Sequence, residues 1–258
     1  MPELEPLDDA AYQRILVVVA HPDDAEYGLS TVVSRWTRRG CQVAYLLMTS
    51  GEAGMQRDPA EAGPLRADEQ QRACAAVGVS DLTILDFPDG MLTYGLDLRR
   101  AIARKIREFR PDVVVGQSWA IEAPWGGFDQ ADHRAVGLAT LDAIRDADNT
   151  WVFPELARDG LAKWATSWLL VSGANPTHYV EIDDEMLAAG VASLSAHESY
   201  LADLPWHPTP EEFLGPMLQG QGSAAGVPRA QLFEVHAMGP GAQDFGESGE
   251  PAQPSSDG

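Results

Sequence analysis

Cysteine is scarce in this chain, which has only Cys41 and Cys74 among its 258 residues. Two cysteines cannot form a disulfide framework or a four-cysteine zinc site. Any bound metal would therefore be held mainly by histidine and carboxylate side chains. We expect both cysteines to be small buried residues.

Basic residues are also few, with 18 Lys and Arg against 39 Asp and Glu, so the formal net charge is −21. Such a charge repels polyanions, which argues against nucleic acid and anionic membranes as partners and leaves a small molecule. The longest aliphatic run, residues 15–20, is too short to span a bilayer. Because the acidic N-terminus also lacks the apolar segment of a signal peptide, we expect a cytoplasmic protein. The sequence leaves the oligomeric state open, including a homo-oligomer.

Apolar runs with the spacing of strands alternate with helical patterns along most of the chain. The expected strands are residues 15–20, 43–48, 82–85, 113–115 and 168–171, and the expected helices are residues 26–39, 65–77, 96–109, 132–144 and 183–197. This alternation predicts an α/β fold, a three-layer, Rossmann-like and mostly parallel sheet with helices on both faces.

The chain shows no linker that would divide it before residue 200. We therefore predict one domain over residues 1–238. Residues 204–222, punctuated by Pro, Gly and Trp, are expected to form a surface excursion. Residues 239–258 are rich in Gly, Pro and Ser and have hardly any aliphatic side chains, which predicts a disordered tail.

Polar side chains follow the predicted strands. His21, Asp23 and Asp24 come after the first strand, Glu52 after the second and Asp89 after the third, while the long loop after the fourth strand ends at Asp132 and His133. Ligands bind beyond the carboxyl ends of the strands in an open parallel sheet, so these groups should converge at one edge.

The segment His21-Pro22-Asp23-Asp24 has the composition of a metal site. Two adjacent carboxylates repel each other unless a cation or a proton lies between them. Zinc held by two histidines and one aspartate, with an open position for water, would relieve this repulsion, and the second carboxylate could act as general base. His133 is the most plausible distant ligand. Alternatively, Asp23 or Asp24 caps the helix that follows. The spacing does not say which aspartate binds and which abstracts a proton.

Four segments together resemble the PIG-L/LmbE family of zinc-dependent N-deacetylases of N-acetylglucosaminyl compounds and related amidases. They are Ala20-His21-Pro22-Asp23-Asp24 after the first strand, Thr49-x-Gly51-Glu52 after the second, Arg66-x-x-Glu69 in the next helix and Asp132-His133-Arg134 after the long loop. The resemblance covers roughly residues 14–200.

This resemblance implies one zinc ion per chain, bound by His21, Asp24 and His133, and Asp23 as the general base that activates water. It also implies that Arg66 holds a substrate hydroxyl or phosphate. The alternative for Arg66 is a salt bridge with Glu69 or Glu52.

Further substrate-binding candidates are the strand-end acids Glu52 and Asp89 and, in the long loop, Trp125, whose alternative role is that of a packing anchor.

The chain departs from the family pattern at Gln130. Many members have a histidine there that assists as an acid or an oxyanion partner, whereas Gln130 can donate a hydrogen bond but cannot deliver a proton. Gln130 would then be an oxyanion donor only, and His178 is our candidate for the acid. Asp132 would contact a metal ligand and hold it in orientation.

We expect His197, His207 and His236 to be surface or packing residues.

The leading hypothesis is a metal-dependent hydrolase of a linear amide, an N-deacetylase of an N-acetylglucosamine-type conjugate. A near variant is an amidase of a thiol–sugar conjugate. A metal- or sugar-binding protein that has lost catalysis is the alternative suggested by Gln130. A nucleotide-binding enzyme is disfavoured, because neither a Gly-x-Gly-x-x-Gly segment nor a P-loop follows the first strand.

Overall fold

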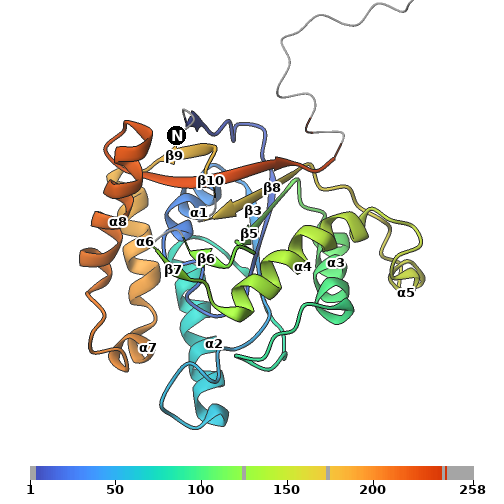
Figure 1. The fold of residues 1–258 in the computed structure, drawn as a ribbon, viewed down its shortest axis with the longest axis horizontal. Coiled ribbons are helices and arrows are strands. Elements are labelled where there is room, and N and C mark those ends of the chain that lie inside the picture. Colours follow the sequence, from blue (N-terminus) through green and yellow to red (C-terminus); the bar gives the residue numbers. More distant parts are fainter. Residues whose placement is uncertain (1–3, 124–125, 173–174, 240–241, 243–258) are drawn as a thin grey trace, which may run out of the picture.

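The structure is a computed structural model of the chain and describes residues 4–123, 126–172, 175–239 and 242 (Figure 1). Its strands are β1 (Glu5–Pro6), β2 (Arg14–Val19), β3 (Gln42–Leu47), β4 (Asp81–Ile84), β5 (Val113–Gln117), β6 (Glu122–Ala123), β7 (Gly127–Phe128), β8 (Trp168–Ser172), β9 (His178–Glu181) and β10 (Ala230–Ala237). Its helices are α1 (Leu29–Arg38), α2 (Pro59–Ala76), α3 (Leu96–Phe109), α4 (Ala131–Ala147), α5 (Pro154–Arg158), α6 (Asp184–Ser195), α7 (Glu198–Ala202) and α8 (Pro210–Ala225).

The main sheet has the strand order β1-β9-β10-β8-β5-β2-β3-β4, and β6 and β7 form a separate hairpin. β2 pairs in parallel with β3 and β5, and β5 pairs in parallel with β8. Only β10 runs antiparallel to its neighbours in this sheet as described, β8 and β9. The predicted mostly parallel sheet is therefore confirmed.

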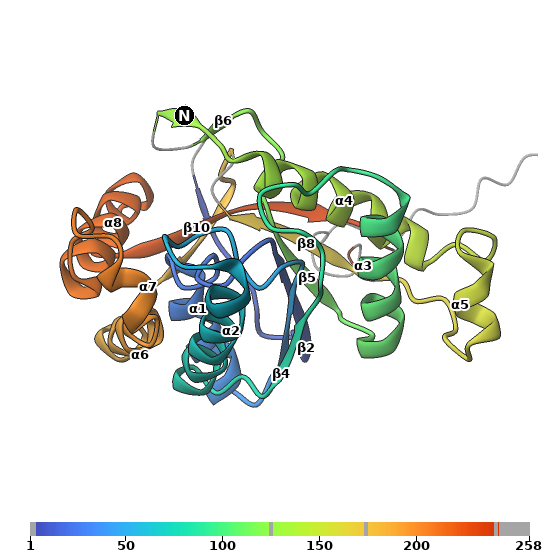
Figure 2. The same ribbon diagram turned by 90° about the horizontal axis from the view of Figure 1, so that it is seen from below.

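Two apolar cores cover the two faces of the sheet. Along β2, Ile15, Val17 and Val19 belong to one core, with residues of α1, α6 and α8. Leu16 and Val18 belong to the other core, with residues of α3 and α4. Alternate side chains of a strand point to opposite faces, so a strand covered on both sides is apolar, as this one is from Ile15 to Val19. Figure 2 shows the helices on either side of the sheet, which confirms the predicted three layers.

Three of the expected elements differ from the structure. The second helix begins at Pro59 rather than at Leu65, because Asp58 caps it by accepting a hydrogen bond from the backbone N–H of Ala60. The first helix begins at Leu29 rather than at Glu26, because residues 21–28 form a turn that ends at Gly28 with a φ of 126°. The region 204–222 was expected to be a surface excursion, but most of it lies in α8. The capping box of Thr209 and Glu212 starts this helix, although Pro216 lies inside it.

The predicted tail, residues 239–258, lies almost entirely outside the described residues and stays a prediction. In the part of the chain that the structure describes, no helix has the length and apolar character needed to cross a membrane.

Candidate functional site

The turn between β2 and α1 carries the first group of functional side chains. One carboxylate oxygen of Asp24 accepts a hydrogen bond from the backbone N–H of His21 at 2.7 Å, which closes the turn on itself. Asp23 has a φ of 85°, in the left-handed region. The N-cap of α1 is Gly28, which makes no side-chain cap, so the alternative interpretation of Asp23 or Asp24 as the helix cap is wrong.

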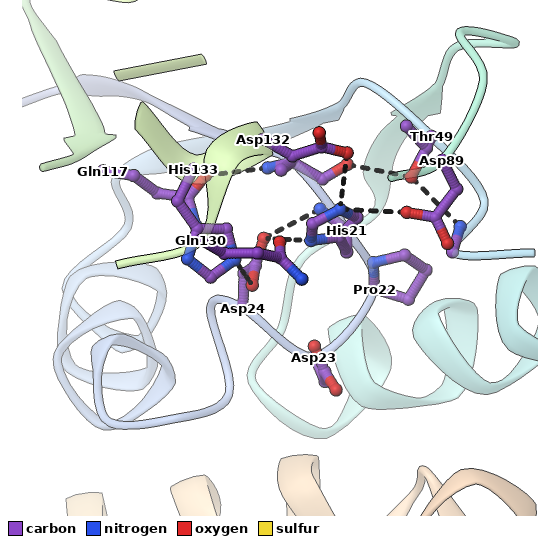
Figure 3. A network of polar contacts seen from close by, with 12 residues as sticks. His21, Pro22, Asp23, Asp24, Thr49, Asp89, Gln117, Gln130, Asp132 and His133 are labelled. Carbon is purple, nitrogen blue, oxygen red and sulfur yellow. Dashed lines mark hydrogen bonds and ion pairs between the residues drawn. The ribbon is translucent and has the colours of Figure 1, made fainter. Parts of the chain in front are cut away.

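His133 lies beside His21 and Asp24, although it follows them by more than a hundred residues in sequence. Nε2 of His133 lies 3.0 Å from Oδ1 of Asp24, and Nδ1 of His21 lies 3.5 Å from Oδ2. The two imidazole rings have centroids 5.3 Å apart. One ligand atom from each residue lies within 4.8 Å of the others, which is close enough to share one ion (Figure 3).

The opposite ring nitrogens of the two histidines face carboxylates. Nε2 of His21 lies 3.0 Å from Oδ1 of Asp89 and 3.2 Å from Oδ2 of Asp132. Nδ1 of His133 lies 3.0 Å from Oδ1 of Asp129. Metal-binding histidines generally donate their second N–H to such an acceptor, which fixes the ring and its tautomer. This arrangement leaves Nδ1 of His21 and Nε2 of His133 free to bind an ion beside Asp24.

A second set of ligand atoms, from His21, Asp89 and Asp132, also lies within 4.8 Å. It uses the other nitrogen of His21. The carboxylate of Asp132 already accepts hydrogen bonds from the backbone N–H groups of Gly90 and Leu92, at 2.8 and 3.1 Å. Each oxygen of Asp132 thus already accepts a backbone N–H, whereas the backbone hydrogen bond to Asp24 uses only Oδ2. The set containing His133 is therefore better suited to an ion, because it leaves Oδ1 of Asp24 for the metal.

Protonation of the ion-free cluster follows from these contacts. Burial disfavours the imidazolium form of His21, but hydrogen bonds to Asp24 and Asp89 outweigh it and raise its pKa to about 11. Burial also disfavours the imidazolium form of His133, but the neighbouring Asp24 and Asp129 outweigh it and raise the pKa of His133 to about 10. Burial would raise the pKa of Asp24, yet His133 and His21 hold it well below its usual range. Positive charge is thus favoured between these side chains, as expected where a cation binds.

Asp23 lies apart from this cluster and has a different partner (Figure 3). Its Oδ2 lies 3.2 Å from Nη2 of Arg66. The Arg66 residue is buried, with 3 % of its surface exposed. The Arg66 guanidinium also donates to the backbone oxygens of Pro22 and Gly51, at 2.6 and 2.9 Å. Burial raises the pKa of Asp23 to about 6, although Arg66 opposes the rise. The alternative salt bridge of Arg66 with Glu69 or Glu52 is therefore wrong, because the partner is Asp23.

A cavity of about 210 Å³ joins the two parts of the site. It is lined by His21, Asp23, Asp24, Tyr27, Gly54, Arg66, Asp89, Gln130, His133 and Tyr200. Sequence reasoning missed Tyr27 and Tyr200. The guanidinium carbon of Arg66 lies 4.1 Å from the centroid of the Tyr200 ring. Tyr200 is far from every motif in sequence, and no local signal marks it as part of the site.

Of the remaining predicted site residues, Gln130 lines the cavity and Glu52 does not. Gln130 precedes the first residue of α4 and lines the cavity. Glu52 lies behind the cavity, where its Oε1 accepts a hydrogen bond from the backbone N–H of Asp89 at 2.9 Å. Glu52 therefore positions the loop of Asp89 rather than facing the cavity. Trp125 lies outside the described residues.

His178 is not brought into the cluster. It is the first residue of β9, and in the strand order β10, β8 and β5 separate β9 from β2. Its polar contacts within the described chain are with Thr177, at 2.8 Å, and with Glu5, at 4.0 Å. This position gives no support to a role of His178 as the acid.

Residues 16–144 match the family model described as PIG-L: GlcNAc-PI de-N-acetylase. The chain belongs to the PIG-L family. The match contains His21, Asp24 and His133, together with Asp23 and Arg66. The predicted family is thereby confirmed.

Relatives of this PIG-L chain include two named deacetylases. It is 28 % identical to the diacetylchitobiose deacetylase of Thermococcus kodakarensis, a match that covers 78 % of this chain and 74 % of the relative. It is 26 % identical to a probable N-acetyl-alpha-D-glucosaminyl L-malate deacetylase 2 of Bacillus anthracis, over 74 % of this chain and 82 % of the relative. The expected enzyme class, a deacetylase that cleaves an amide C–N bond, is confirmed by the family and by these relatives.

The fold of this PIG-L chain is similar to that of N,N'-diacetylchitobiose deacetylase from Pyrococcus horikoshii. The TM-score is 0.78 at 21 % identity, and the match covers 88 % of this chain and 85 % of the other. The predicted α/β class is confirmed by this likeness.

Proposed function

We propose that this chain is a zinc-dependent N-deacetylase of an N-acetylglucosamine-type conjugate, with one ion per chain bound by His21, Asp24 and His133. The observation that carries the proposal is the convergence of these three side chains beside a fourth, Asp23, that remains outside the set. A protein that only stored metal would not need that second carboxylate.

Zinc suits this set of donors better than other common ions. Two imidazoles and one carboxylate are typical of catalytic zinc sites, which leave a further position open. Calcium and magnesium prefer all-oxygen sets, and the chain offers no thiolate here. The buried acceptors Asp132 and Asp129 hold the two rings in the orientation that such an ion requires.

The reaction is the addition of water to the amide, which yields a free amine and acetate. A bound zinc ion would polarise the amide carbonyl and lower the pKa of water. Asp23 takes the proton of the attacking water on its carboxylate, and Arg66 at 3.2 Å keeps that carboxylate ionised beforehand. The side-chain amide of Gln130 donates a hydrogen bond to the oxygen that becomes negative. Because Gln130 cannot give up a proton, protonated Asp23 returns its own proton to the leaving nitrogen.

The substrate is a small molecule with an acetylated amino group. We assign Asp89 and Arg66, which both line the cavity, to its hydroxyl groups. Trp125 stays a candidate for contact with a sugar ring. We place the reaction in the cytoplasm, and a homo-oligomer is compatible with the site. The amidase variant would use the same chemistry with another conjugate in the cavity.

The experiment that tests the proposal combines metal analysis with an amine-release assay. Protein purified without added metal should contain about one zinc ion per chain and should release amine from N-acetylglucosamine conjugates. The Asp23→Asn variant should keep the metal and lose nearly all turnover. Equal turnover by this variant would remove Asp23 from the mechanism, and metal well below one ion per chain without rescue by zinc would contradict the proposed centre.

A further inference from the structure

We infer that a row of aromatic side chains formed by Tyr27, His207 and Trp206 is a binding site for the second ring of a two-ring substrate. We call it the aromatic row. The inference rests on the proposed function and adds to it the size and the chemistry of the conjugate. All three residues lie outside the four segments that carry the family resemblance.

The cavity is smaller than pockets that bury most of a drug-sized ligand. Its volume is about 210 Å³. Pockets that enclose a complete small-molecule ligand typically measure roughly 300–1,000 Å³. The acetylated sugar can enter the cavity, but whatever is attached to it must lie on the rim.

One part of that rim is aromatic. Tyr27 lines the cavity. Its ring centroid lies 5.6 Å from that of His207, and the His207 centroid lies 5.8 Å from that of Trp206. The three rings therefore lead stepwise from the cavity to the surface. Trp206 ends the row with 74 % of its surface exposed, which is unusual for so large an apolar side chain.

The inner part of the row is held in place. The hydroxyl of Tyr27 lies 3.1 Å from Nε2 of His207, and Nδ1 of His207 lies 2.6 Å from the backbone oxygen of Pro208. A carbonyl oxygen can only accept, so Nδ1 of His207 donates to Pro208. Phe213 of α8 packs behind both rings, with centroids 5.2 and 5.4 Å away. A fixed aromatic surface loses little conformational entropy when a ligand packs on it.

The chemistry of the row favours a second sugar ring. A pyranose ring presents a face of C–H groups, and such a face packs well on the electron-rich face of an aromatic ring. The row contains no lysine or arginine side chain. It would therefore favour an uncharged ring over a phosphate or another anionic group.

The test compares one-ring and two-ring substrates in metal-loaded enzyme. We expect Trp206→Ala to lower kcat/KM about tenfold for N,N'-diacetylchitobiose and less than about twofold for N-acetylglucosamine. Trp206→Phe should restore most of the loss. The matched control is Trp151→Ala, because Trp151 is 83 % exposed but lies just before α5, outside the aromatic row. An equal loss for both substrates, or no loss for either, would overturn the inference.

Failure of the proposed function would look different. In that case the wild-type enzyme would release no amine from either substrate. Calorimetric binding of N,N'-diacetylchitobiose to the metal-loaded Asp23→Asn protein would still test the aromatic row. Binding that weakens about tenfold on adding Trp206→Ala supports the aromatic row, and binding that does not change overturns it.

Discussion

The side-chain oxygen of Gln70 accepts a hydrogen bond from the backbone N–H of Asp23 at 3.0 Å. The amide nitrogen of Gln70 donates to Oε1 of Glu26 at 3.1 Å, which fixes the orientation of the amide. Gln70 and Glu26 are both buried. Asp23 has a φ of 85°, and a non-glycine residue in that region costs about 1–3 kcal/mol unless its surroundings hold it there. The hydrogen bond with Gln70 helps to hold Asp23 in this conformation.

Replacing Gln70 with Leu should therefore lower kcat by roughly tenfold or more, since the base would no longer be fixed in place. KM and the metal content should change little, because Gln70 touches neither metal ligand nor cavity. Gln71→Leu is the matched control on the same helix, because Gln71 is exposed. Wild-type kcat in Gln70→Leu would show that Asp23 needs no support from Gln70.

Removing the charge of Arg66 should shift the pH profile of kcat/KM. Asp23 must be ionised to act as a base, so activity is lost as the pH falls through its pKa. Burial raises that pKa to about 6 and Arg66 lowers it. In Arg66→Met the pKa should rise further, and the acidic limb should move to higher pH by roughly one unit or more. Arg66→Lys keeps a cation and should shift the limb less. An acidic limb that is the same in all three proteins would refute this role of Arg66.

Metal binding should release protons. Without an ion, His21 and His133 have pKa values raised to about 11 and about 10, so both are protonated at pH 7. Each must lose one proton to bind an ion. Zinc affinity should therefore rise with pH until both imidazoles are neutral. Calorimetry in buffers of different ionisation enthalpy should show release of about two protons at pH 7, and heats that do not depend on the buffer would contradict this.

Asp129 should strengthen metal binding through His133. Its Oδ1 lies 3.0 Å from Nδ1 of His133. Asp129→Asn should weaken zinc binding by roughly 10- to 100-fold, as is usual for such supporting carboxylates. Asp142→Asn is the control, since Asp142 accepts a hydrogen bond from the hydroxyl of Tyr94 and does not line the cavity. Equal zinc affinity of the two variants in competition with a chelator would speak against the support of His133 by Asp129.

Much of the fold and the core of the site could be predicted from sequence. The buried strands are continuous apolar runs, and the carboxyl ends of parallel strands meet at one edge. This reasoning brings His21 and His133 together from sequence alone. It failed at α8, where Pro216 and three glycines obscure the helical pattern. It also did not anticipate the antiparallel strand β10.

The side chains around Asp23 could not be predicted because their contacts cross between distant segments. The sequence suggested a substrate group or, alternatively, a nearby glutamate as the partner of Arg66, but the left-handed turn at Asp23 brings the carboxylate of Asp23 to it. Tyr200 reaches the same place from α7. His178 was chosen because it follows a predicted strand, yet it belongs to β9, which lies toward the other end of the sheet.

The most direct test of the metal centre is anomalous X-ray diffraction at the zinc edge from crystals of the protein. We predict a single strong peak within bonding distance of Nδ1 of His21, Nε2 of His133 and a carboxylate oxygen of Asp24, with Asp23 unbound. A peak between His21, Asp89 and Asp132 instead, or no peak in crystals soaked with zinc, would contradict the account.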